Sequence, residues 1–356
     1  MSDSLRVGLV GYGSSGRGLH SRLLREVGQR VTHVVVRDPV RAAAARADWP
    51  GVIIDPDVKS MLSRAAELDL VVVASPTGAH LVNVDAALEA SLPVVVDKPL
   101  ATTTDDARRL ARTAEAHSGR LTVYQNRRWD SEQLTLRSVL ASGALGNVHR
   151  FERRWERWRP VPQHRWKELD IQSGGLLLDL GSHLVDSAVQ LFGPVVSVYA
   201  ELQSLSTPAE DDVFLALRHA PGPNGHEVRS HLQAGALVGA PGPRTRVLGD
   251  AGAYLVTSYE GEPTPFALLE DFPHKRHNPA GAKHEGWLVH GSELTPVPRA
   301  PGGHADFYRA VVRWLTIGGP VPVDPWDAVR TAAVLDAARV SAREGRVVEL
   351  RQITAV

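Results

Sequence analysis

Short apolar runs alternate with polar, helix-forming segments over the first third of the chain. The runs occupy residues 7–10, 31–36, 52–54, 69–74, 92–96 and 121–125. Continuous apolarity over a few valine-rich residues is typical of strands buried on both faces of a parallel sheet. Because helical patterns separate the runs, we expect a doubly wound α/β domain whose ligands bind outside the carboxyl ends of the strands.

The first apolar run leads directly into a glycine-rich turn. The turn reads Gly11-Tyr12-Gly13-Ser14-Ser15-Gly16, and a helical segment follows over residues 17–27. In this strand–turn–helix context, Gly11 permits the turn, Gly13 lets the backbone approach a pyrophosphate, and Gly16 lets the helix pack closely. The helix N-terminus favours phosphate. We expect all six residues to contact a dinucleotide; a merely structural turn is the alternative.

The end of the second strand bears on the choice of dinucleotide. Asp38 precedes Pro39 and a helical run, which is the arrangement of an N-cap with proline at the first helical position. Asp38 therefore already has a structural role, whereas Arg37 has none visible. Arginine at this place accommodates the 2′-phosphate of NADP, and a carboxylate binds the ribose of NAD. We expect NADP, with NAD as the alternative.

Two later strand ends add polar residues to the same site. Ser75 and Pro76 follow one strand, and His80 starts the next helix. Asp97 and Lys98 follow another, where a lysine placed after a buried valine run is unusual for a surface residue. We expect these residues beside the glycine turn, with Lys98 also in contact with substrate.

The second half of the chain predicts an antiparallel sheet. Segments with alternating or short apolar patterns cover residues 150–159, 197–203, 213–218, 228–233, 246–249 and 253–258. Helical patterns cover residues 175–192, 305–317 and 326–344. We expect a Rossmann domain over residues 1–124. Residues 125–356 should form a substrate-binding and oligomerisation α+β domain with a large, mainly antiparallel open sheet. We read residues 262–285 as a solvated connection.

Composition limits the possible functions. The 356 residues contain 40 basic and 40 acidic side chains and no cysteine, which disfavours nucleic acid and excludes disulfides and thiolate metal sites. The interleaved basic and aromatic residues of 150–159 could bind nucleic acid, but a strand with Trp155 and Trp158 exposed at a homo-oligomer face fits the neutral charge better. With no leader or membrane-spanning pattern, we expect a soluble cytoplasmic protein without a bound metal.

Several segments resemble the Gfo/Idh/MocA oxidoreductases. They are VGLVGYGSSG, ASPTGAHLVNVDAALEA, VVVDKPLA, VYQNRRWD, HRWKE, GGLLLDLGSHLVDSAVQLFG and the tail from Gly303 to Leu350. The family's usual Glu-Lys-Pro is Asp97-Lys98-Pro99 here. The combination looks closest to the branch holding NADP-dependent scyllo-inositol dehydrogenases. The resemblance implies cofactor contacts from Asn126 and Trp166, and substrate contacts from Arg128 and Lys167.

The resemblance also implies a catalytic set in the DLGSH segment. Asp179 and His183 are four residues apart, on one helical face. An imidazole is a natural general base near neutral pH, and Lys98 supplies a cation for a developing oxyanion. We expect Lys98, Asp179 and His183 to be catalytic, in a cleft between the domains, on a cyclic polyol or sugar. A dinucleotide-binding sensor without turnover is the alternative.

Overall fold

The chain folds into two compact units in a computed structural model that describes residues 4–222, 224–256 and 284–351. The first unit comprises residues 4–126 and 303–329, and the second comprises the remaining described residues. Of the connection expected at 262–285, only residues 284 and 285 are among those described.

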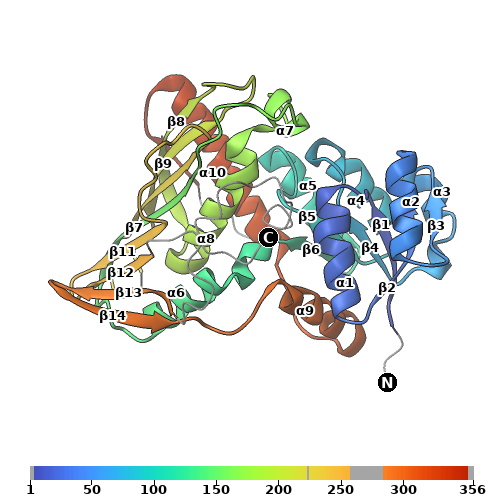
Figure 1. Cartoon of the computed structure of the whole chain (residues 1–356), viewed down its shortest axis with the longest axis horizontal. Helices are drawn as coiled ribbons and strands as arrows, with labels where there is room; N and C mark the ends of the chain where they lie inside the picture. Colours follow the sequence, from blue (N-terminus) through green and yellow to red (C-terminus); the bar gives the residue numbers. More distant parts are fainter. Residues whose placement is uncertain (1–3, 223, 257–283, 352–356) are drawn as a thin grey trace. The chain divides into compact units, whose positions relative to one another are not determined.

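A six-stranded sheet forms the centre of the first unit (Figure 1). Its strands are β1 (Arg6–Val10), β2 (Arg30–Val35), β3 (Ile53–Asp55), β4 (Leu70–Val73), β5 (Val94–Asp97) and β6 (Leu121–Tyr124). All neighbours are parallel, in the order β3-β2-β1-β4-β5-β6. The order reverses between β1 and β4, so the carboxyl ends of these two strands mark the crevice where such sheets bind ligands.

Helices connect the strands of the first unit. They are η1 (Gly16–Ser21), α1 (Arg22–Glu26), α2 (Pro39–Asp48), α3 (Val58–Leu62), η2 (Ala65–Glu67), η3 (Thr77–Ala79), α4 (His80–Glu89), α5 (Thr104–Ala116) and α9 (His304–Ile317). The Thr103 side chain caps α5, whose first turn carries Asp105 and Asp106. Residues distant in sequence complete this unit, since Thr122 on β6 exchanges two 3.0 Å hydrogen bonds with the Val323 backbone.

The second unit is built on a nine-stranded sheet. Its strands are β7 (Val148–Glu156), β8 (Val195–Gln203), β9 (Asp212–His219), β10 (Arg229–Gly235), β11 (Thr245–Gly249), β12 (Ala253–Val256), β13 (His284–His290), β14 (Glu293–Pro298) and β15 (Val348–Glu349). The order is β14-β13-β12-β11-β7-β10-β9-β8-β15. Within the described part of this second sheet, β7 and β10 form the only parallel pair. The sheet is therefore mixed and mainly antiparallel, as expected.

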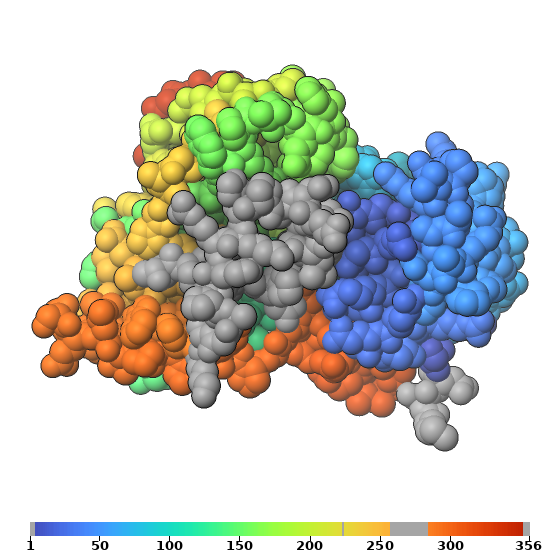
Figure 2. All heavy atoms as spheres, in the orientation of Figure 1, coloured from blue at the N-terminus to red at the C-terminus, as the bar shows by residue number. Residues whose placement is uncertain are grey.

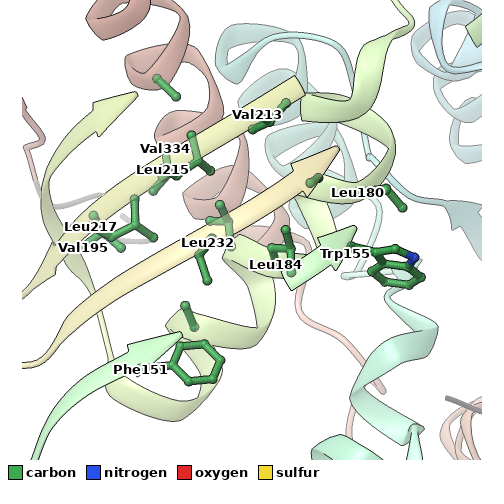
Figure 3. Packing of buried hydrophobic residues seen from close by; sticks show 14 of the residues in the cluster. Phe151, Trp155, Leu180, Leu184, Val195, Val213, Leu215, Leu217, Leu232 and Val334 are labelled. Atoms are coloured by element: carbon green, nitrogen blue, oxygen red, sulfur yellow. The ribbon is translucent and has the colours of Figure 1, made fainter. Parts of the chain in front are cut away.

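The helices of the second unit are few. They are α6 (Ser131–Ala141), α7 (Trp166–Leu169), the short π-helical segment η5 (Leu177–Gly181) and α8 (Ser182–Phe192). The turn η4 (Asn126–Trp129) and the helix α10 (Pro325–Glu344) each cross from one unit into the other. The core of this unit lies between the sheet and α8 and α10, where Leu184 and Val334 pack with Leu215 and Leu232 (Figure 3).

Strand β7 bears out one expectation on one side and corrects another. It pairs antiparallel with β11, as expected, and parallel with β10 on its other side. Trp155, expected at an exposed face, is only 2% exposed and lies at the edge of the buried cluster of this unit (Figure 3). Trp158, beyond the strand, is 53% exposed. The edge strands among the described ones are β14 and β15, and the orange atoms of the exposed strand β14 lie at the left of Figure 2.

Candidate cofactor and substrate sites

The glycine turn has the geometry of a phosphate cradle. Gly11 has φ of +94°, and a Cβ there would lie 2.8 Å from the Ala74 carbonyl oxygen. A Cβ at Gly16 would collide with the Gly11 carbonyl oxygen. At Gly13 the nearest atom to such a Cβ is Nη1 of Arg41, 3.7 Å away, so the backbone is open to a close approach. The first turn of η1 carries no acid. These residues therefore fit a dinucleotide pyrophosphate.

The side chain of Tyr12 belongs to the core and does not point to an open cradle. Its hydroxyl donates to Asp48 at 2.8 Å and lies 3.2 Å from the Ser21 Oγ. Burial, with the Asp48 carboxylate, raises the pKa of Tyr12 to about 12. Tyr12 can therefore contact a cofactor through its backbone alone.

The end of β2 combines a helix cap with two arginines. Asp38 is the N-cap of α2, since its Oδ1 accepts the Arg41 backbone N–H at 2.9 Å, and Pro39 begins the helix. The predicted structural role of Asp38 is thus confirmed. Arg37 is exposed just before it. Arg41, which the sequence reasoning did not single out, places a second guanidinium beside Gly13.

The turn after β4 is tied to the turn after β5 through His80. His80 is 1% exposed; its Nδ1 lies 2.9 Å from the Pro99 carbonyl oxygen and its Nε2 lies 2.9 Å from that of Ser75. Asn83 donates to the Ser75 hydroxyl at 3.1 Å. The imidazole of His80 is therefore engaged in holding two strand ends together.

Asp97 is fixed on both carboxylate oxygens. Its Oδ1 accepts the Lys98 backbone N–H at 2.8 Å, and its Oδ2 accepts the Ser15 hydroxyl of the glycine turn. Burial alone would raise the pKa of the Asp97 carboxyl, but His20, the Ser15 hydroxyl and the charge of Lys98 outweigh burial and hold this pKa well below its usual range. Lys98 itself is half-buried at the strand end.

Two pockets in the second unit are lined by three of the predicted substrate residues, Lys167, Asp179 and His183. The first is here called the Lys167 pocket. Its charged and hydroxyl lining comprises Arg157, Arg159, Arg165, Lys167, Glu168, Asp179, Ser206, Thr207, Glu210 and Asp211. Lys167 Nζ donates to Asp179 Oδ1 at 2.5 Å, and Arg165 pairs with Glu168 at 2.7 Å. Lys167 and Asp179, which the sequence predicts as substrate contacts from two different segments, are therefore hydrogen-bonded to each other in one pocket.

Trp166, expected to contact the cofactor, is adjacent in sequence to Lys167 but does not line this pocket, whereas Glu210 does. Trp166 is 39% exposed, and its ring centroid lies 5.8 Å from the Lys167 Nζ. Glu210 was missed, because an isolated glutamate beside a strand carries no local signal. Gly175 has φ of +82° and lets the Glu210 carboxylate approach, where it accepts the Leu177 N–H at 3.2 Å. Burial raises the pKa of Glu210.

The second pocket, here the His183 pocket, is smaller than the first. His183, in the first turn of α8, stacks on Trp155 with ring centroids 5.9 Å apart and planes inclined by 27°. The guanidinium groups of Arg127 and Arg244 lie 4.6 Å and 4.3 Å from the Trp155 ring centroid. The sequence pattern predicts Trp155 at an oligomer contact; in the structure its ring instead stacks on His183.

Two further predicted residues are engaged within their own units. Arg128 forms a two-pronged ion pair with Asp186, at 2.6 and 2.9 Å, in the second unit. Asn126, at the end of the first unit, is 6% exposed, and its Nδ2 lies 3.5 Å from the His304 Nε2.

Neither a metal centre nor a membrane helix is found in the described part of the chain. No group of three or more His, Asp or Glu side chains could hold a metal ion there. Across the same residues, none of the helices combines the length and apolarity needed to cross a bilayer.

Comparisons with known proteins agree with this architecture. Residues 5–125 match the NAD-binding Rossmann fold of an oxidoreductase family, and residues 137–350 match its C-terminal alpha/beta domain. The chain is 33% identical to the uncharacterized oxidoreductase YdgJ of Escherichia coli, over 96% of this chain and 98% of that one. It is 26% identical to the scyllo-inositol 2-dehydrogenase (NADP⁺) IolW of Bacillus subtilis, over 98% and 96%.

The fold is equally close to solved structures. The structure of the oxidoreductase YvaA from Bacillus subtilis superposes with a TM-score of 0.84 at 25% identity, and the match covers 99% of both chains. Both units of this chain and the full lengths of its relatives are therefore accounted for. The chain belongs to the Gfo/Idh/MocA family of oxidoreductases and carries that family's NAD(P)-binding domain.

Proposed function

We propose that this oxidoreductase transfers a hydride between the nicotinamide of NADP and a secondary alcohol or ketone of a cyclic polyol or sugar. The observation that carries the proposal is the balance of charge in the Lys167 pocket. Four basic side chains line it, and so do four acidic ones. A lining of balanced charge that offers both donors and acceptors suits a neutral ligand with many hydroxyl groups, since each hydroxyl both donates and accepts.

The proposed roles follow from the chemistry of each side chain. When bound, the dinucleotide supplies hydride transfer. His183 takes the proton from the reacting hydroxyl as general base. Lys98 stabilises the developing charge on the oxygen. Asp179 binds a neighbouring hydroxyl, and Lys167 holds the Asp179 carboxylate in place through their 2.5 Å contact.

Two observations support NADP over NAD. The Asp38 carboxylate already accepts the Arg41 backbone N–H, so it is engaged as a helix cap and less available to a ribose. Arg37 and Arg41 add two cations near the end of β2. A 2′-phosphate would bind there. The similarity to an NADP-dependent scyllo-inositol 2-dehydrogenase supports the same cofactor and an inositol-like substrate.

The proposal is tested by a substrate panel. The purified protein is incubated with inositol isomers and common sugars, with NADP⁺ and separately with NAD⁺, and absorbance is followed at the reduced-nicotinamide band. We expect turnover of at least one cyclic polyol or sugar, faster with NADP⁺. Tight NADP(H) binding without turnover of any substrate, in either direction, would contradict the proposal and favour a dinucleotide-binding sensor.

A further inference from the structure

His20 is a buried titratable side chain that the proposed chemistry does not use. It lies in η1, directly after the glycine turn, and is 0% exposed. Its Nδ1 lies 2.6 Å from the hydroxyl of Tyr308 on α9. The ring packs on Tyr124, with centroids 4.5 Å apart, and edge-on to Tyr308, at 6.0 Å. These aromatic contacts hold the imidazole in one orientation.

The other ring nitrogen of His20 faces Asp97. Its Nε2 has no hydrogen-bond partner and lies 3.8 Å from the Asp97 Oδ2. Leaving a buried imidazole nitrogen without a hydrogen bond is costly, so packing alone does not account for a histidine at this place. The nearby carboxylate gives the nitrogen an electrostatic partner.

Asp97 links three parts of the first unit. One oxygen accepts the backbone N–H of Lys98, and the other accepts the hydroxyl of Ser15 from the glycine turn and faces His20. The side chain of aspartate is short, so the position of its carboxylate depends on these neighbours. Because the Lys98 backbone N–H donates to this carboxylate, the residues that orient the carboxylate also orient the peptide group from which the Lys98 side chain projects.

We propose that His20 is a positioning residue: together with Ser15 it holds the Asp97 carboxylate in the orientation that fixes Lys98 beside the cofactor cradle. This rests on the proposed function of Lys98. Because His20 is fully buried, it cannot itself touch a substrate, and it acts only through Asp97.

The test uses three variants of the full-length protein. His20→Phe keeps an aromatic ring in contact with Tyr124 and Tyr308 and removes both ring nitrogens. His20→Gln places an amide N–H near the former Nε2 and should restore the contact to Asp97. His219→Phe is the matched control, because His219 is also 0% exposed and is bonded through both nitrogens, at 2.8 Å each, to Gly193 and Ser230 of the second unit.

Two readouts separate positioning from simple destabilisation. Amide hydrogen exchange, measured by mass spectrometry, should accelerate in His20→Phe within peptides covering residues 94–100, and not in the His219→Phe control. With the substrate found by the panel, kcat should fall about 10- to 100-fold while the KM for NADP changes little, since misplacing a catalytic group costs turnover. His20→Gln should recover most of the loss.

Each outcome decides the proposal. Unchanged exchange over residues 94–100 in a folded His20→Phe variant overturns it, and so does full activity in that variant when Lys98→Ala is inactive. Equal losses in His20→Phe and in the His219→Phe control also overturn it, because they indicate general destabilisation. If Lys98→Ala is itself fully active, the proposed function of Lys98 has failed, and the exchange measurement alone decides whether His20 orders the strand end.

Discussion

Replacing Asp179 by asparagine should separate substrate chemistry from stability. The change preserves shape and removes the charge that faces the Lys167 Nζ at 2.5 Å. The Lys167 side chain is 35% exposed and the Asp179 side chain 21%, so water screens the charges of this ion pair. Partly exposed ion pairs contribute at most about 1 kcal/mol to folding. In a chain of this size a loss of that order lowers the Tm by about 2–4 °C at most.

The expected effect of the same change on activity is larger. A hydrogen bond between a charged group and a substrate hydroxyl contributes about 1.5–3 kcal/mol, so kcat/KM should fall roughly 10- to 150-fold. Steady-state rates with NADP⁺ and the polyol measure this loss, and a thermal melt measures stability. NADP affinity should stay constant, because Asp179 lies in the second unit and the glycine turn in the first.

A matched pair provides the control. Asp85 pairs with Arg109 at 2.6 Å in the first unit, with side chains 12% and 64% exposed, and lines neither pocket. Asp85→Asn should change the Tm by a similar amount and leave kcat/KM unaltered. The reasoning is refuted if Asp179→Asn retains wild-type kcat/KM, or if both variants lose activity in parallel with stability.

Four further predictions concern the cofactor, the catalytic groups, pH and assembly. Arg37→Ala should weaken NADP binding by about 1.5–3 kcal/mol and leave NAD binding unchanged, as measured by calorimetry; equal losses for both cofactors would exclude Arg37 as the discriminator. His183→Ala and Lys98→Ala should each lower turnover by about 10²–10⁴-fold at constant cofactor affinity, and Lys98→Arg should not restore it. Burial lowers the pKa of the His219 imidazole in the folded protein. Below about pH 6.5 the unfolded chain therefore binds more protons than the folded one, and the free energy of unfolding falls as the pH drops. Urea titrations at several pH values should show that His219→Phe reduces this pH dependence by up to about 1.4 kcal/mol per pH unit. Light scattering at micromolar concentration should show a homo-oligomer, with exposed Trp158 in its interface; a monomer would contradict this.

Local patterns were enough to predict the first unit's sheet. The strands β1, β4 and β5 are valine-rich and buried along nearly their whole length, so continuous apolarity identified them. The glycine turn and the Asp38 cap were also readable, because each depends on residues adjacent in sequence. The resemblance to a family added Lys167 and Asp179, which the structure joins in one pocket.

Features that depend on distant residues could not be read in this way. The first turn of helix α6 buries Glu132 and Gln133 against Arg244 and Arg153, so polar residues interrupt the apolar face by which an amphipathic helix is recognised. Trp155 looked exposed because its neighbours in sequence are charged, whereas two of the cations that cover it come from other segments. The attachment of residues 303–329 to the first unit likewise has no local signal.

Transfer of deuterium from substrate to cofactor would demonstrate the proposed hydride transfer itself. The protein is incubated with NADP⁺ and a polyol deuterated at its ring carbons, and the reduced cofactor is analysed by mass spectrometry, with the Lys98→Ala and His183→Ala variants alongside. We predict that the wild-type protein forms NADPH carrying one deuterium from the ring carbon, and that both variants form it far more slowly. Failure to label the cofactor with any polyol or sugar of the panel, by a protein that binds NADP⁺, would contradict the account.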